Sequence, residues 1–339
     1  MEFIKNTVKN FRISTLLIII ISAILSSCQK PNPELGPKPG IWRGEISAQG
    51  NQIPFNFEVN KNDGSYQIKL INGIEKLDID RIDVLNDSLF FDMHIFDISI
   101  KAKIFEDSLV GSYSKNYADD YILPFKAIYG KEGRFDQVES SNLFDGTWET
   151  TFKAEDGKET SAIGVFKTEG QMLRGTFLTQ TGDYRYLDGY TSKDTMYLYT
   201  FDGNHIYKFR AFKENDSILK GEYWSGKTSY KTFVSKKNDT IKLPDANSLT
   251  YLKEGYDHID FSFPDLDGKL TSLEDEKYKD KIVILQILGT WCPNCMDETR
   301  FFADWYNKNK SQGVEIIGLA YEIKPEFEYA RDRVLTMKE

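Results

Sequence analysis

Two cysteines separated by two residues form the stretch of the chain with the clearest potential for chemistry. They lie in the sequence Trp291-Cys292-Pro293-Asn294-Cys295. If a helix begins at Cys292, its unpaired backbone N–H groups and the positive end of its dipole favour a thiolate over a thiol. Cys292 is then the nucleophile, and Cys295, within one turn of it, can resolve a mixed disulfide. The spacing predicts disulfide exchange that leaves a Cys292–Cys295 bond.

The segments around the cysteines are predicted to form a βαβ unit. Residues 282–288 are apolar except for Gln286, as in a strand buried on both faces of a parallel sheet. Pro293 suits a first helical turn, where its missing N–H costs nothing. A second strand in the same direction requires the helix as a right-handed crossover. The predicted elements are a hairpin at 261–263 and 270–273, strands at 282–288 and 314–320, and helices at 297–310 and 325–337.

These residues resemble the TlpA/ResA-like, thioredoxin-fold family of membrane-tethered thiol-disulfide oxidoreductases. The resemblance covers about Tyr256–Glu339 and is carried by the apolar strand, the W-C-x-x-C sequence, and segments 261–269 and 313–320. It implies a thioredoxin-like fold outside the cytoplasm. It also implies that the favoured reaction is reduction of protein disulfides, with electrons from an upstream thiol donor.

The residues beside the cysteines add two expectations. By resemblance, Glu298 occupies the position of a glutamate that assists proton transfer at the cysteines. The alternative is a solvated helix carboxylate beside Asp297. Trp291 is expected to shield Cys295, whereas Pro293 and Asn294 supply no cation of the kind that makes a strong oxidant.

A cysteine pair can also serve a zinc site, a structural bridge or a peroxidase. A closed zinc site needs four ligands, but the only other cysteine is Cys28 and the three histidines are scattered, at His94, His205 and His258. We therefore predict no metal and no cofactor. A structural bridge over two residues would constrain the unfolded chain little. A peroxidase is the closer alternative, with Thr290 two residues before Cys292, although a resolving cysteine one turn away favours disulfide exchange.

The first 28 residues are typical of a bacterial lipoprotein leader. Three basic residues, at Lys5, Lys9 and Arg12, precede an apolar run at 13–25 and the sequence Leu25-Ser26-Ser27-Cys28. Cys28 is therefore predicted to carry acyl chains that hold the protein to a membrane. An uncleaved anchor helix is the alternative. In either case the body lies outside the cytoplasm, on the periplasmic side or the cell surface.

Composition is consistent with a folded, exported body. The chain has 339 residues, 40% of them hydrophobic, which predicts two or three domains. Lys plus Arg number 43 against 52 for Asp plus Glu, a net charge of −9, so nucleic acid is an unexpected partner. If Cys28 is lipidated, the redox pair has no other cysteine to form a wrong disulfide.

The region between the tether and the redox domain is predicted to hold two copies of one all-β module. Short stretches rich in aromatic and β-branched residues alternate with Asn, Asp and Gly. A Gly-x-Trp opening recurs 106 residues later, from Trp42 to Trp148, and an Asp-Ser/Thr turn recurs 107 residues later, from Asp87 to Asp194. The tryptophans weakly resemble those that plug lipocalin-type barrels, but we expect them to be ordinary core residues.

The sequence therefore predicts a multidomain protein with two tandem all-β modules, barrels or sandwiches, and an α/β thioredoxin-like domain. The predicted limits are a signal peptide at 1–27, a tether at 28–39, β modules at 40–135 and 143–238, a linker at 239–258 and a redox domain at 259–339. We expect an exported, lipid-anchored protein-disulfide reductase. The alternatives are a surface binding lipoprotein whose β modules hold a ligand and a peroxiredoxin-like peroxidase.

The thioredoxin-like domain is also expected to be truncated after its second parallel strand and the following helix. No residues remain for the antiparallel strand pair, the final helix and the cis-proline loop that the resemblance implies. One edge of the strand pair should then be unpaired. Such a chain could form the Cys292–Cys295 disulfide but would turn over poorly.

Overall fold

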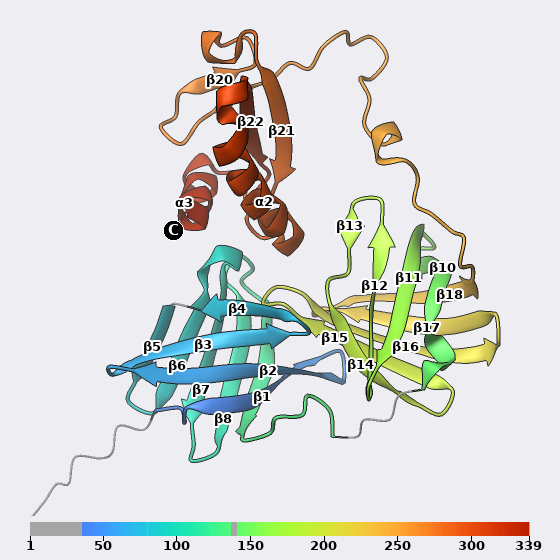
Figure 1. The fold of residues 1–339 in the computed structure, drawn as a ribbon. Coiled ribbons are helices and arrows are strands. Elements are labelled where there is room, and N and C mark those ends of the chain that lie inside the picture. Colours follow the sequence, from blue (N-terminus) through green and yellow to red (C-terminus); the bar gives the residue numbers. More distant parts are fainter. Residues whose placement is uncertain (1–35, 80, 137–140, 339) are drawn as a thin grey trace, which may run out of the picture. The chain divides into compact units, whose positions relative to one another are not determined.

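The computed structural model describes residues 36–79, 81–136 and 141–338. The predicted signal peptide, the lipidation site Cys28 and most of the predicted tether lie outside these residues. Within them the chain forms two antiparallel sheets of nine strands each and a smaller α/β region (Figure 1). This arrangement confirms the predicted order of two all-β modules and a thioredoxin-like region.

The first sheet, module 1, is a barrel-like meander with strand order β4-β3-β2-β1-β9-β8-β7-β6-β5. Its strands are rich in β-branched and aromatic residues that alternate between core and solvent; in β9, for example, Leu123, Phe125 and Ala127 are buried. The bounds are β1 Gly40–Ala48, β2 Asn51–Asn62, β3 Ser65–Asn72, β4 Glu75–Ile79, β5 Arg81–Leu85, β6 Ser88–Met93, β7 Ile98–Ile104, β8 Ser108–Lys115 and β9 Ile122–Tyr129, with a 3-10 turn at His94–Phe96.

The second sheet, module 2, has counterparts of all nine strands, and it closes on itself. Strand β11 pairs with β12 as well as β10, and β12 pairs with β14, which completes a ring. The bounds are β10 Gly146–Ala154, β11 Glu159–Glu169, β12 Met172–Thr179, β13 Gly182–Asp183, β14 Leu187–Ser192, β15 Thr195–Phe201, β16 Ile206–Asn215, β17 Ile218–Ser225 and β18 Ser229–Lys237, with a 3-10 turn at Asn142–Phe144 before β10. The matching strand order accounts for the repeat seen in the sequence.

The two repeated tryptophans are core residues, as expected. Trp42 and Trp148 are 0% and 1% exposed. Each indole Nε1 donates to the backbone carbonyl four residues earlier, that of Lys38 or Phe144, at 2.8 Å in both cases. A buried indole needs a partner for its N–H, and the same local bond satisfies it in both modules.

Module 2 contributes side chains to the core of module 1. Tyr199, Phe201 and Ile206, around the turn between β15 and β16, belong to the same buried cluster as the interior of module 1. The ring of Phe201 lies 4.3 Å from that of Phe55, centroid to centroid. Aromatic pairs at this distance contribute beyond their buried area, so the two modules share one apolar core.

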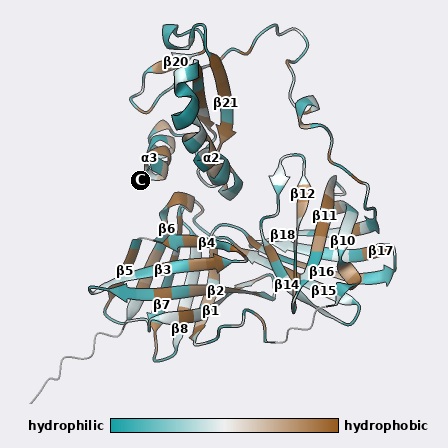
Figure 2. Ribbon diagram, viewed as in Figure 1, coloured by the Kyte–Doolittle hydropathy of each residue, from teal (hydrophilic) through white to brown (hydrophobic). Residues whose placement is uncertain are grey.

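The C-terminal region contains the predicted hairpin and βαβ unit. Strands β21 and β22 run parallel, with Ile282 opposite Val314, and β21 is hydrophobic except at Gln286 (Figure 2). The helix between them starts at Pro293, four residues before the predicted range, because proline fits the first helical position. The bounds are β19 Ser262–Pro264, β20 Leu270–Ser272, β21 Ile282–Leu288, α2 Pro293–Asn309, β22 Val314–Ala320 and α3 Phe327–Lys338, with 3-10 turns at Ala246–Ser248, Glu276–Tyr278 and Lys310–Gln312.

Strands β21 and β22 pair only with each other among the described residues. Ile282 and Ile287 of β21 are each 67% exposed, although the apolar run predicted burial on both faces. The pair therefore presents apolar surface and free strand edges here. In the described ranges, no helix is both long and apolar enough to cross a membrane.

Two equivalent glycines, one in each sheet, are in close contact with different kinds of neighbour. Gly111 of β8 and Gly221 of β17 are equivalent, and a Cβ at either would clash. At Gly111 the atom would strike the backbone carbonyl oxygen of Lys101, whereas at Gly221 it would meet the ring of Phe233. We expect Gly111→Ala to destabilise by about 3 kcal/mol and Gly221→Ala by about 1 kcal/mol, because a side chain can shift and a paired backbone cannot. Urea unfolding of both variants measures this, and equal losses would contradict it.

Candidate active site

Cys292 caps the N-terminus of α2. Its backbone is extended, with φ −103° and ψ 106°, and its Sγ accepts a hydrogen bond from the backbone N–H of Cys295 at 3.2 Å. Cys292 and Cys295 are joined by a disulfide, with their Cα atoms 5.2 Å apart. The structure therefore brings the two predicted cysteines together at a helix start, where the free N–H groups favour negative charge on sulfur.

The turn that leads into the helix is fastened to the end of β22. Thr290 is fully buried, and both its backbone N–H and its Oγ1 donate to the carboxylate of Glu322, at 2.9 and 2.8 Å. The indole of Trp291 donates to the carbonyl of Tyr321 at 3.0 Å. These bonds hold the segment before Cys292 in one conformation. They also occupy the hydroxyl of Thr290, the residue on which the peroxidase alternative rests.

The one polar residue in the apolar strand reaches the helix. Gln286 is buried, and its Nε2 donates to Glu298 Oε2 and to Thr299 Oγ1, both at 3.0 Å. Thr299 Oγ1 in turn donates to the carbonyl of Cys295 at 2.8 Å. Glu298 is exposed but oriented by Gln286. Gln286, which interrupts the apolar run, therefore connects β21 to the helical residues that follow the redox pair.

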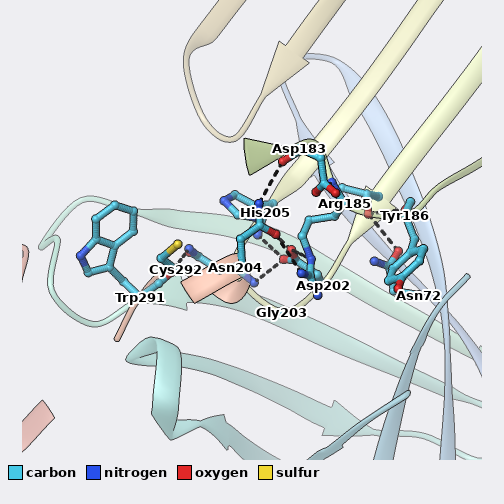
Figure 3. Close-up of polar contacts among 12 residues, drawn as sticks. Asn72, Asp183, Arg185, Tyr186, Asp202, Gly203, Asn204, His205, Trp291 and Cys292 are labelled. Carbon is cyan, nitrogen blue, oxygen red and sulfur yellow. Dashed lines mark hydrogen bonds and ion pairs between the residues drawn. The ribbon is translucent and has the colours of Figure 1, made fainter. Parts of the chain in front are cut away.

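Module 2 also contacts the redox motif. Figure 3 shows Asn204 beside Trp291 and Cys292, and its Nδ2 donates to the carbonyl of Trp291 at 2.7 Å. Asn294, between the cysteines, donates from Nδ2 to the carbonyl of Asp183 at 3.2 Å. The motif is thus bonded on both sides of Cys292 by residues more than eighty positions earlier in the chain.

Arg185 links the motif to both modules. It is 7% exposed, and its Nη1 donates to Asn294 Oδ1 at 2.8 Å and to Asp297 Oδ2 at 2.6 Å. Its Nη2 pairs with Glu75 of β4, and its Nε lies 3.5 Å from Asp202 Oδ2. Three carboxylates from module 1, module 2 and α2 therefore surround one guanidinium. Figure 3 shows two of these four residues, Arg185 and Asp202.

Arg185 and His205 together offset the cost of burying the carboxylate of Asp202. Burial would raise the pKa of Asp202, but the charge and hydrogen bonds of His205, together with Arg185, lower it overall. The His205 ring nitrogen Nδ1 lies 2.8 Å from Asp202 Oδ2. Burial raises the pKa of Glu75 despite the nearby Arg185. Asp202 is therefore ionised, and the stability it contributes is lost as the pH falls through its lowered pKa.

Lys115 is expected to make the stability of this region depend on pH. Its Nζ donates to Asn204 Oδ1 at 2.8 Å, and burial lowers its pKa from 10.5 to about 8, although Asp202 opposes the shift. Between these two values the unfolded chain keeps a proton that the folded chain has lost, so stability rises with pH. From pH 7.5 to 9.5 we expect the wild type to gain roughly 1 to 2 kcal/mol relative to Lys115→Met. Urea midpoints of both proteins at the two values measure this, and parallel curves would contradict it.

Several contacts at the site were not predicted from the sequence, namely those of Glu322, Asn204 and Arg185. Two of the histidines contact nearby carboxylates: His258 pairs with its neighbour Asp257, and His205 with Asp202. Within the described ranges, no three His, Cys, Asp or Glu side chains gather closely enough to hold a metal ion.

Comparisons with known proteins concern the C-terminal region. Residues 255–332 match the AhpC/TSA family. The thiol-disulfide oxidoreductase ResA of Bacillus subtilis (strain 168) is 41% identical over 68 residues, which cover 20% of this chain and 37% of that protein. ResA of Bacillus thuringiensis subsp. konkukian (strain 97-27) is 42% identical over 65 residues, 19% of this chain and 36% of the relative. The chain thus spans just over a third of the length of the ResA proteins it matches, and its C-terminal part is a thioredoxin-like domain of the AhpC/TSA type.

Two solved structures are similar to parts of the chain. A redesigned β barrel, b11L5F_LGL, is 18% identical with a TM-score of 0.24, covering 30% of this chain and 97% of its own. A second redesigned barrel, mFAP1 bound to DFHBI, is 16% identical with a TM-score of 0.24, covering 28% of this chain and 96% of its own. Similarity at this level assigns neither fold nor ligand to this chain.

Proposed function

We propose that the C-terminal domain is a thiol-disulfide oxidoreductase that reduces protein disulfides through Cys292 and Cys295. The observation that carries this proposal is the disulfide at the start of α2, with Cys292 Sγ at the helix cap and 3.2 Å from the N–H of Cys295. The relatedness to ResA supports the same reaction class. The oxidised pair is the product state of such an enzyme.

The reaction moves two electrons to the substrate. The Cys292 thiolate attacks one sulfur of a substrate disulfide, which breaks the substrate S–S bond, forms a mixed disulfide and releases one substrate thiolate that takes a proton. The Cys295 thiolate then attacks Cys292 Sγ, forms the Cys292–Cys295 bond and releases the second substrate thiol. A thiol donor must reduce this bond before the next cycle. The backbone N–H of Cys295 stabilises negative charge on Cys292 in the first step.

Glu298 is proposed to move the proton that Cys295 loses. Its carboxylate lies in the first turns of α2 and is oriented by Gln286 at 3.0 Å. A carboxylate held in one position can accept a proton repeatedly, directly or through one water. Trp291, Pro293 and Asn294 are proposed to shape the surface that the substrate meets.

Peroxide reduction is the second candidate, because the matched family is AhpC/TSA. Two contacts favour disulfide exchange instead. Thr290 Oγ1 is bonded to Glu322, and Cys292 has its resolving partner one turn away. The third candidate is a binding lipoprotein whose β modules hold a ligand. A cavity of about 820 Å³, lined by Tyr184, Tyr207 and Tyr223 of module 2 and by residues 241–244, supports it.

One assay separates these functions. The reduced protein is mixed with a disulfide-bonded test protein or with hydrogen peroxide, and loss of its two thiols is followed in time. We expect rapid oxidation by the disulfide protein and rates with peroxide at least a hundredfold lower, because the pair is arranged for exchange. Cys292→Ser should remove the reaction. Faster oxidation by peroxide than by the disulfide protein would identify a peroxidase, and no oxidation by either would leave only the binding function.

The proposed location is outside the cytoplasm, with the body anchored to a membrane by acyl chains on Cys28. The Leu25-Ser26-Ser27-Cys28 sequence behind a basic and apolar leader supports this. Cys28→Ser should retain its leader or leave the membrane fraction. A wild-type protein with an unmodified Cys28 in the soluble fraction would contradict the proposal.

A further inference from the structure

An open groove with exposed apolar side chains lies beside the redox motif. Its volume is about 770 Å³. Four large apolar side chains that line it are exposed, Ile74 by 73% and Val165, Tyr186 and Leu243 by 37% to 43%. Single exposed apolar residues are normal on a protein surface, but several that line one groove mark an interaction site. We call the groove lined by these four side chains the docking groove.

Ile74 is held in place although its side chain is largely uncovered. It lies in the two-residue turn between β3 and β4, where glycine and polar residues are usual. Both ends of this turn are bonded to module 2. Asn72 Oδ1 accepts a hydrogen bond from Thr200 Oγ1 at 2.9 Å, and Glu75 pairs with Arg185. Because the turn is already ordered, a partner that covers Ile74 pays little entropy for ordering it.

One end of the docking groove reaches the redox motif. Asn294, which lies between the two cysteines, and Asp297 line the groove together with the apolar side chains. Arg185 fixes this end, because its Nη1 donates to both residues, at 2.8 and 2.6 Å. Cys292 is half-buried and only two residues from Asn294. A substrate chain whose disulfide meets Cys292 can therefore place its next few residues in the groove, since an extended chain advances about 3.3 Å per residue.

The charges in the docking groove favour a basic partner. Its lining includes four carboxylates and two guanidiniums, those of Glu169, Asp183, Asp188 and Asp297 and of Arg174 and Arg185. The guanidiniums are already engaged by the other carboxylates, Arg174 by Glu169 at 2.8 Å and Arg185 by Asp297 at 2.6 Å. Asp183 is exposed, and it forms no ion pair with any of the described residues. A lysine or arginine on the partner would therefore find both an excess of negative charge and an unpaired carboxylate.

We infer that the docking groove binds an apolar, basic segment next to the disulfide of a substrate protein. This inference rests on the oxidoreductase function proposed above. The exposed side chains of the groove pack against apolar residues of the segment, and Asp183 pairs with its basic residue. A small molecule fits this groove less well, because a ligand pocket buries most of its ligand, whereas Ile74 is largely open to solvent. The β modules thereby select substrates for the redox pair.

The test follows oxidation of the reduced whole protein by two disulfide-linked peptides and by hydroxyethyl disulfide, which is small and neutral. The peptides differ only beside the cysteine, where one has leucine, phenylalanine and lysine and the other has two serines and a glutamate. We expect a second-order rate constant at least tenfold higher with the apolar, basic peptide. Ile74→Ser should lower that rate constant at least fivefold and change the rate with hydroxyethyl disulfide less than twofold.

Two further variants sharpen the result. Ile122→Ser is the matched control, because Ile122 is also an exposed isoleucine, at 58%, but does not line the docking groove. It should change neither rate more than twofold. Asp183→Asn retains an oxygen that can accept the hydrogen bond from the backbone N–H of Arg185, which Asp183 Oδ1 accepts at 2.9 Å. It should lower the rate with the basic peptide about threefold at low salt and less at high salt.

The outcomes separate the groove from the function on which it rests. Equal rates with the two peptides, together with ready oxidation by hydroxyethyl disulfide, would overturn the docking groove alone, and this comparison needs no variant. No oxidation by any of the three disulfides would overturn the oxidoreductase function and the groove with it. A dimer in sedimentation that Ile74→Ser dissociates would show that a second copy occupies the groove, and the substrate assignment would then be wrong.

Discussion

Cys295→Ser is expected to stop turnover and to trap the substrate protein on Cys292. Without the second sulfur, nothing within one helical turn of Cys292 can displace the substrate, so the mixed disulfide persists. Serine retains the size and the helical position of Cys295, and the hydrogen bond from its backbone N–H to Cys292 Sγ does not depend on the side chain. The first step should therefore proceed while the second fails.

The experiment uses a disulfide-bonded test protein and non-reducing electrophoresis. The expected product is one adduct of substrate and Cys295→Ser that dithiothreitol releases. Cys292→Ser is the matched control and should form no adduct, because its remaining cysteine lies inside the first turn rather than at the cap. Equal amounts of adduct from both variants would contradict the assignment of Cys292 as the nucleophile. The same trap applied in cells would identify natural substrates.

Arg185→Met is expected to destabilise the folded chain by about 3 to 5 kcal/mol, because it leaves buried carboxylates without their cation. The side chain of Arg185 is 5% exposed, and those of Glu75 and Asp202 are 11% and 0% exposed. Arg185 also has a positive φ of 63°, and methionine keeps a comparable Cβ, so the substitution changes charge more than backbone strain. The effect should be large because three carboxylates share this one guanidinium.

Arg210→Met is the control for that prediction. Arg210 also pairs with a glutamate, Glu222, but its side chain is 47% exposed, so its loss should cost less than about 1 kcal/mol. Unfolding by urea at neutral pH gives both values. If the variants lose similar stability, the buried cluster is not held by Arg185. The rate at which reduced Cys292 is alkylated should also change in Arg185→Met, because the bond from Nη1 of Arg185 to Asn294 is lost.

The sequence predicted most accurately those structural elements that are set by residues close together in the chain. The apolar run before Cys292, Pro293 at the first helical position and Gly313 before β22 specify a βαβ unit, and the structure contains it. The repeated Gly-x-Trp likewise predicted two equivalent sheets. These features follow from periodicity and turn chemistry, which act over a few residues.

The contacts around the redox pair could not be predicted in this way. Asn204 and Arg185 lie 87 and 109 residues before their partners Trp291 and Asn294, and no local pattern marks either one. In the sequence, Asp202-Gly203-Asn204-His205 has the composition of an ordinary surface turn. In the structure, the side chain of Asp202 is fully buried. Gln286 did offer a clue, because a polar residue in a buried strand needs a partner. Burial was overestimated in β21, since pattern alone does not tell which neighbours cover a strand.

The shared apolar core has a consequence for the order in which the chain can fold during synthesis. The last strand of module 1, β9, ends at Tyr129, but the buried cluster at the core of the module also contains Ile206 of β16. The ribosome must add 77 residues after Tyr129 before that side chain exists. At a typical rate of about 5 to 20 residues per second, this delay is roughly 4 to 15 seconds. During this interval Phe55 lacks the ring of Phe201, so the nascent first half stays incompletely folded and open to chaperones.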